Sequence, residues 1–108
     1  SASYDLSVDQ LLAAPNPFSE KTNISFRHNQ YNEELEVMIY IFSINGSLVK
    51  QIGPLLLGST AYMAGGIEWD GNDQNGSPMD TGMYIYKIFI NNQKGSELEY
   101  SGKLLLVR

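Results

Sequence analysis

Residues 34–52 read ELEVMIYIFSINGSLVKQI, and this stretch decides the class of fold. Apolar side chains recur at every second position over residues 35–41, a period that is typical of a β-strand with one buried face. Asn45 and Gly46 follow. An Asn-Gly pair between alternating apolar runs is the strongest short-range hairpin signal, because both residue types tolerate a positive φ. Residues 47–52 return as a strand, so the stretch predicts an antiparallel hairpin.

The same period of two recurs along the rest of the chain. We expect further short strands over residues 22–28, 61–63, 67–70, 83–91 and 97–107. No segment keeps a 3.6-residue period for three turns, so we expect no long helix. About seven short strands separated by turn signals predict an all-β protein, an immunoglobulin-like antiparallel β-sandwich. It has no disulfide, because the chain has no cysteine. Trp69, Tyr84 and Leu104 are expected in or beside its core.

The length fits one domain. With 108 residues, the chain is near the commonest domain size. It begins Ser-Ala-Ser, and its first ten residues are mostly polar, so we expect a piece of a longer protein. On this reading, residues 1–12 are a linker from a preceding domain, and residues 13–108 are a single immunoglobulin-like C-terminal domain.

Composition removes several classes of function. Seven Lys and Arg against twelve Asp and Glu give a net charge of −5, and the basic residues are scattered, which argues against nucleic-acid binding. Without cysteine there is no thiolate nucleophile or thiolate metal site. No apolar run approaches the ~18 residues of a membrane-spanning helix.

Acidic and amide side chains gather in residues 70–76, DGNDQNG, which faintly resemble a calcium loop. Counted as a twelve-residue calcium pattern from Asp70, the loop has Asn75 at the sixth position, where glycine is needed. It has Thr81 at the twelfth position, where a bidentate glutamate is needed. We therefore predict a turn loop whose side chains satisfy the backbone locally, and no metal site.

No arrangement typical of catalysis stands out. His28 is the only histidine, and the chain lacks the G-x-S-x-G pattern of a serine nucleophile. Two carboxylates ~5–9 Å apart can hydrolyse glycosides. Carboxylates cluster twice, as Glu33, Glu34 and Glu36 and as Asp70, Asp73 and Asp80. Charge at a strand edge is better explained as protection against edge-to-edge pairing. We predict no catalytic residue and no cofactor.

Aromatic and apolar side chains fall into two groups. Trp69, Tyr84, Tyr86 and Tyr100 are interpreted mostly as core, because tyrosine and tryptophan bury the ring and keep a wet polar tip. If the strands over residues 35–42 and 83–91 are neighbours, an apolar set points outward from them. We expect this set to be an interface with a preceding domain or with a second copy in a homodimer: Met38, Tyr40, Ile85 and Phe89.

Several stretches, taken in order, resemble a known family. They are APNPF at 14–18, ISF at 24–26, IYIFSINGSLV at 39–49, WDGNDQNG at 69–76, GMYIY at 82–86 and KLLLVR at 103–108. Together they resemble the C-terminal sorting domain of type IX secretion system cargo in Bacteroidetes, and the related immunoglobulin-like module of the flagellar hook-capping protein. The stretch over residues 53–64 matches little.

The resemblance implies a function. Such a domain is not an enzyme: it is a sorting signal read by the outer-membrane translocon, and in cargo it is usually removed by a surface sortase. Components of the machinery, including the cell-surface sortase, can keep theirs, and such a component is one possible source of this chain. The implied partners are the translocon and attachment-complex proteins. The implied route is through the periplasm to the outer membrane, the cell surface or the medium.

The resemblance and the position at the chain end select candidate residues. We expect strand addition to a terminal signal made of Lys103, Leu104, Leu105, Leu106, Val107 and Arg108. The motif residues that match the family are Pro15, Asn16, Pro17, Gly82 and Tyr84. Two other functions stay open, a structural immunoglobulin-like spacer and a carbohydrate-binding module of a secreted bacterial protein.

Overall fold

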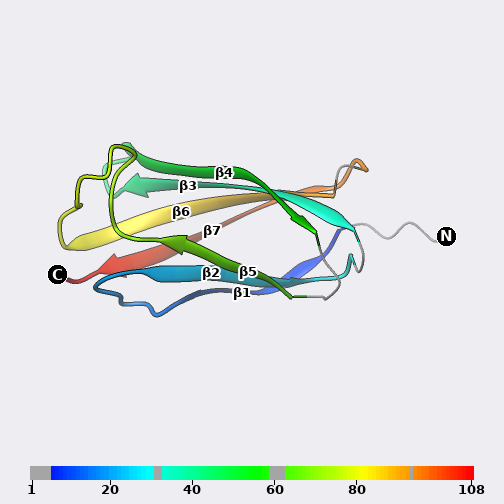
Figure 1. Ribbon diagram of the computed structural model, residues 1–108, viewed down its shortest axis with the longest axis horizontal. Helices are drawn as coiled ribbons and strands as arrows, with labels where there is room; N and C mark the ends of the chain where they lie inside the picture. The colour runs from blue at the N-terminus through cyan, green and yellow to red at the C-terminus, as the bar shows by residue number, and fades with distance from the viewer. Residues whose placement is uncertain (1–5, 31–32, 59–62, 93) are drawn as a thin grey trace.

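Two antiparallel sheets lie face to face in the computed structural model, which describes residues 6–30, 33–58, 63–92 and 94–108, without the side chains of 63–65 (Figure 1). One sheet has the order β1-β2-β5, and the other has the order β4-β3-β6-β7. The strands are β1 (Val8–Ala14), β2 (Thr22–His28), β3 (Glu34–Ser43), β4 (Leu48–Gly58), β5 (Met63–Trp69), β6 (Gly82–Asn91) and β7 (Glu97–Leu106). The predicted all-β, immunoglobulin-like sandwich is confirmed. Within these ranges nothing forms a helix of the length and apolarity that a bilayer crossing needs.

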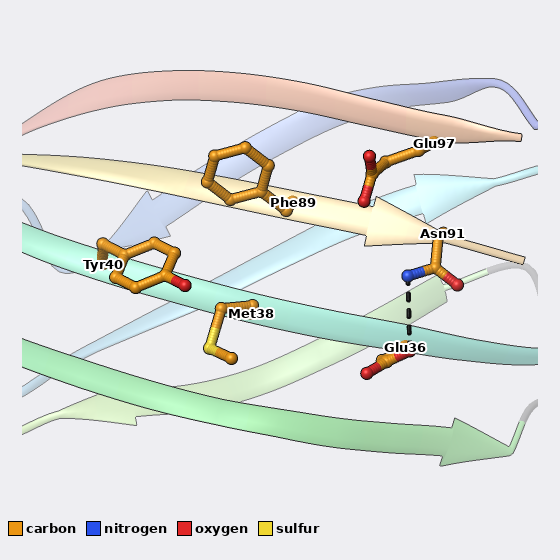
Figure 2. A pocket seen from close by; sticks show the side chains of 6 residues that line it. All are labelled: Glu36, Met38, Tyr40, Phe89, Asn91 and Glu97. Carbon is orange, nitrogen blue, oxygen red and sulfur yellow. Dashed lines mark hydrogen bonds between the residues drawn. The ribbon is translucent and has the colours of Figure 1, made fainter.

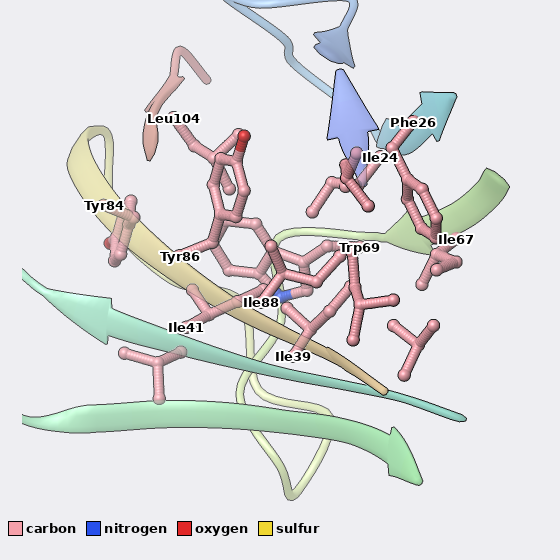
Figure 3. Close-up of a cluster of buried hydrophobic side chains, with 14 of the residues drawn as sticks. Ile24, Phe26, Ile39, Ile41, Ile67, Trp69, Tyr84, Tyr86, Ile88 and Leu104 are labelled. Atoms are coloured by element: carbon pink, nitrogen blue, oxygen red, sulfur yellow. The ribbon is translucent and has the colours of Figure 1, made fainter. Parts of the chain in front are cut away.

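Alternating side chains build the core between the sheets (Figure 3). Strands β3 and β6 are paired neighbours as expected, with Val37 opposite Ile90 and Ile39 opposite Ile88. Their inward residues are Leu35, Val37, Ile39, Ile41, Tyr84, Tyr86, Ile88 and Ile90, and the other sheet contributes Ile24, Phe26, Ile67 and Trp69. Each large apolar side chain fully buried here stabilises the fold by ~1.5–3 kcal/mol.

The predicted core markers are buried. Trp69 is 1% exposed, Tyr84 5% and Leu104 0%. The Trp69 and Tyr84 rings meet edge to face with centroids 5.3 Å apart, a favourable aromatic geometry. Both polar tips are satisfied, because Trp69 Nε1 donates to Asn72 O at 2.8 Å and Tyr84 Oη donates to Asp80 O at 2.7 Å.

Part of the expected linker belongs to the fold. Residues 8–12 lie in β1, and Leu6 and Val8 are buried. The register of β1 against β2 shifts between Asp9 and Leu12, and Gln10 has a positive φ of 52°. This bulge breaks the period of two, which is why the strand is hard to see in the sequence. Residues 1–5 are outside the described residues, and their role as a linker stays a prediction.

The predicted hairpin is confirmed and extends further than expected. Its turn is closed by Ser43 N donating to Ser47 O at 2.8 Å, and Gly46 supplies the positive φ of 90°. Strand β4 continues past a bulge at Gly53 through residues 53–58, where the sequence predicted no strand. There φ is 107° and a Cβ would lie 2.7 Å from Val37 O, so only glycine fits. Of the short strand expected over 61–63, residues 61 and 62 are outside the described residues.

Candidate functional site

The C-terminal segment consists of the last part of β7, at the edge of the four-stranded sheet, and the two residues that follow it. We call residues 103–108 the terminal segment. Leu104 and Leu106 are fully buried and hold it to the core. Leu105 is 37% exposed and Val107 46% exposed. The side chains of the terminal segment therefore alternate between buried and exposed from Leu104 to Val107, as in a strand with one buried face.

A second segment, residues 15–18, covers the outer edge of the terminal segment, and we call it the anchor segment. Asn16 acts like a short strand: its Nδ2 donates to Lys103 O at 2.9 Å, and its Oδ1 accepts from Leu105 N at 2.9 Å. Phe18 N then donates to Leu105 O at 3.0 Å, and Val107 N donates to Phe18 O at 2.9 Å. Four successive main-chain groups at this edge are therefore already bonded.

The anchor segment is itself fixed to the core. Phe18 is 3% exposed, and its ring lies 5.5 Å from that of Trp69. Thr22 is fully buried on β2, and its Oγ1 donates to Pro15 O at 2.7 Å. These tertiary contacts hold Asn16 next to β7.

Arg108 fastens the end of the chain. Its backbone N donates to Thr81 Oγ1 at 2.9 Å, its Nε to Met79 O at 2.8 Å and its Nη2 to Gly71 O at 2.9 Å. Gly71 has a φ of 78°, and a Cβ there would lie 2.7 Å from Arg108 Nη2. The positive φ favours glycine at this position of the Trp-Asp-Gly motif, whereas the close Arg108 Nη2 is the end of a flexible side chain that can move aside.

The motif residues Gly82 and Tyr84 lie on the other side of the terminal segment. Gly82 pairs with Leu106 and Tyr84 with Leu104 across the β6–β7 ladder. Burial raises the pKa of the Tyr84 phenol, with a further rise from Asp80 and an opposing effect of Arg108. Pro15 and Pro17 flank Asn16 in the anchor segment. Motif residues from distant parts of the chain therefore meet around the terminal segment at one end of the sandwich.

Two carboxylates of the loop between β5 and β6, those of Asp70 and Asp73, accept hydrogen bonds from the backbone of the same loop. Asp70 Oδ1 accepts from Asn72 N at 3.1 Å. Asp73 Oδ1 accepts from Asn75 N and from Ser77 N, both at 2.9 Å. This is the geometry of Asx turns, which stabilise a loop locally. In the described ranges no three metal-ligating side chains gather in one place.

His28 lies in the core, with 3% of its surface exposed. Its Nδ1 accepts from Gln30 N at 3.0 Å, and its ring packs 6.1 Å from that of Phe26. Burial lowers the pKa of the imidazole. These contacts make His28 a structural residue of the end of β2.

Tyr40 and Phe89, with Met38 and Ile85, lie half-buried on the outer face of β3 and β6. The Tyr40 and Phe89 rings are 5.7 Å apart at 85°. Rings at this angle do not share a flat face, whereas the Tyr40 and Phe42 rings lie 6.4 Å apart at 32°. Trp69, Tyr84 and Tyr86 point into the core (Figure 3). The expected interface at this face stays a prediction.

Comparison with known proteins gives a structural likeness. No protein-family model and no curated protein matches the sequence. The chain is similar to part of dimeric latent PorU from Porphyromonas gingivalis, with 25% identity and a TM-score of 0.77 over 97% of this chain and 10% of PorU. It therefore spans about a tenth of that protein. It also resembles in fold part of the alkylpurine DNA glycosylase AlkC of Pseudomonas fluorescens bound to DNA, with 19% identity and a TM-score of 0.60 over 99% of this chain and 32% of AlkC.

Proposed function

We propose that this chain is a non-catalytic C-terminal sorting domain that directs a parent protein through the outer membrane by the type IX secretion system. Its likeness to part of PorU, a component of that system, supports the proposal. The stretches that resemble the sorting family support it independently. The partners are then the outer-membrane translocon and the attachment complex, and the destination is the cell surface or the medium.

One observation carries the proposal: the motif residues converge on the terminal segment. Asn16, Gly71 and Tyr84 come from three distant parts of the chain, and each lies against residues 103–108. A short peptide held in one conformation before it meets a receptor loses less entropy on binding. Such an arrangement suits a recognition element better than it suits a plain spacer.

Because the anchor segment covers the edge of β7, a receptor would have to recognise the terminal segment in another way than by strand addition. Strand addition needs free main-chain groups, and the anchor segment bonds those from Lys103 O to Val107 N. A partner strand at this edge would have to displace the anchor segment. We therefore replace strand addition with recognition of exposed side chains, namely Lys103, Leu105 and Val107, together with the neighbouring anchor segment.

The test uses a reporter with residues 1–108 fused to its C-terminus, in a bacterium with a working type IX system. The variant Leu105→Ser with Val107→Ser removes exposed apolar side chains and leaves Leu104 and Leu106 in the core. Surface delivery should fall about tenfold or more, since each apolar side chain buried by a receptor contributes ~1.5–3 kcal/mol and 1.4 kcal/mol is tenfold.

The matched control is Leu48→Ser with Leu56→Ser, a pair on β4 with 54% and 59% exposure. Delivery of the control should stay at the level of the unchanged domain. Thermal unfolding of all three proteins verifies that they fold alike. Equal delivery of both variants would refute the role of the terminal segment, and it is the result that a structural spacer predicts.

A further inference from the structure

A hollow of about 320 Å³ lies on the outer face of the four-stranded sheet (Figure 2). Three neighbouring strands supply its walls: β3, β6 and β7. The lining residues are Glu36, Met38, Tyr40, Phe89, Asn91 and Glu97. The hollow combines an apolar side with an acidic side, and it is separate from the terminal segment.

The acidic side consists of two carboxylates in one row of the sheet. Glu36 pairs with Asn91 on β6, and Asn91 pairs with Glu97 on β7. The two glutamates are therefore two strands apart, roughly 10 Å between their backbones. Asn91 lies between them, and its Nδ2 donates to Glu36 Oε1 at 3.4 Å, which directs that carboxylate (Figure 2).

Neither carboxylate is neutralised by a cation in the part of the chain that the structure describes. The ion pairs there are Lys21–Glu68, Arg27–Asp9 and Lys94–Glu33. With a net charge of −5, the chain also attracts basic partners at long range. The carboxylates of Glu36 and Glu97, which lie on one side of the hollow without an ion-pair partner among the described residues, favour a cationic ligand there.

The apolar side of the hollow can contact both the methylene chain and the cationic group of a basic side chain. The Tyr40 and Phe89 rings meet at 85°, with centroids 5.7 Å apart, and Met38 lies beside them. A cation is attracted to the face of an aromatic ring, and the methylene stem of a long basic side chain packs on apolar surface.

We propose that this hollow binds an arginine side chain of a partner polypeptide. A guanidinium is planar, carries five N–H donors and stacks on aromatic rings, so it can donate toward both carboxylates. A lysine ammonium is a compact, strongly hydrated charge and fits two separated acceptors less well. The two arginines of this chain, Arg27 and Arg108, are engaged with Asp9 and with Gly71, so the arginine comes from outside these 108 residues.

The test is an NMR titration of the whole chain with the peptide acetyl-Gly-Arg-Gly-amide. Two matched peptides replace arginine with citrulline, its uncharged near-isostere, or with lysine. Arginine should shift the amide signals of Glu36, Tyr40, Phe89 and Glu97, lysine should bind more weakly, and citrulline should shift none of them. Glu97→Gln should weaken arginine binding about two- to fivefold, the range expected for one exposed charge pair.

Glu20→Gln is the control variant, because Glu20 is exposed, carries the same charge and lies outside the four-stranded sheet that forms the hollow. It should leave arginine binding unchanged. Equal weakening by both variants, or equal shifts with citrulline, would overturn the proposal. Dilution of the free protein tests a second copy as occupant: concentration-dependent shifts at these same residues would also overturn it.

Discussion

The ring of Tyr86 lies directly over Gly102 on the neighbouring strand. The two residues are partners in the β6–β7 ladder, and a Cβ at Gly102 would lie 2.5 Å from Tyr86 Cε2. Tyr86 is only 4% exposed, and burial raises the pKa of its phenol. Because Gly102 has no side chain, the Tyr86 ring can pack against the backbone of β7 at this position.

Gly102→Ala should therefore destabilise the domain by about 1–3 kcal/mol, because the added methyl overpacks the core against the Tyr86 ring. Urea unfolding followed by tryptophan fluorescence measures the loss. Gly58→Ala is the control, since a Cβ at Gly58 meets nothing within 4 Å. It should change stability by less than about 0.5 kcal/mol. A similar loss in both proteins would show that ring packing is not the cause.

Tyr84→Ala should lower the free energy of unfolding by about 3–5 kcal/mol, through lost burial and the cavity left beside Trp69. Tyr84→Phe keeps the ring and removes only the hydrogen bond to Asp80 O, so its cost should be about 1 kcal/mol. Chemical denaturation of the two variants measures both losses in the free energy of unfolding and so compares the ring with the hydroxyl. If Tyr84→Phe costs as much as Tyr84→Ala, the hydroxyl is the main contribution and the ring is not.

Asn16→Ala should loosen the anchor segment, because it removes both side-chain bonds to β7. Hydrogen exchange of the Leu105 and Val107 amides should accelerate, while exchange of the Ile88 amide in the sheet centre should not. Asn75→Ala is a suitable control at an exposed loop position. Unchanged exchange at Leu105 would mean that Asn16 does not protect this edge.

Stability should fall below neutral pH on account of His28. Burial holds the pKa of its imidazole below the usual 6.5, so the unfolded chain binds a proton at a pH where the folded chain does not. Protonation then favours unfolding, and the free energy of unfolding decreases as the pH falls through 6.5. Urea unfolding at pH 7.5 and at pH 5.5 measures the difference. His28→Asn keeps an acceptor for Gln30 N and should reduce the pH dependence; an unchanged pH dependence would assign it to other groups.

Local pattern accounts for most of the sheet that carries the site. The period of two predicted the buried face of β3 and the burial of Tyr84 and Leu104, and it placed Met38, Tyr40, Ile85 and Phe89 on the outer side of β3 and β6. It failed at β1 and in the second half of β4, because the irregular backbone near Gln10 and Gly53 interrupts the alternation.

The periodicity of the sequence did not predict the long-range contacts that shape the site. Asn16 and Leu105 are 89 positions apart, and Gly71 and Arg108 are 37 apart. No short-range periodicity encodes such pairs, since they arise only when the sheets close on each other. The family resemblance selected Asn16 as a motif residue but gave no indication that it caps the edge of β7.

The route of the chain through the sandwich also has a mechanical consequence. β1 begins at one end of the long 48 Å axis, and the chain leaves β7 at Leu106 and reaches Arg108 at the other end (Figure 1). Tension applied between these two ends acts along the strands, whereas interstrand hydrogen bonds are directed across them. The bonds that hold β7 to β6 and to Phe18 are therefore loaded in shear and must break together instead of one after another. A domain built in this way resists being pulled open along its length, and its lifetime under load is set by the barrier to unfolding.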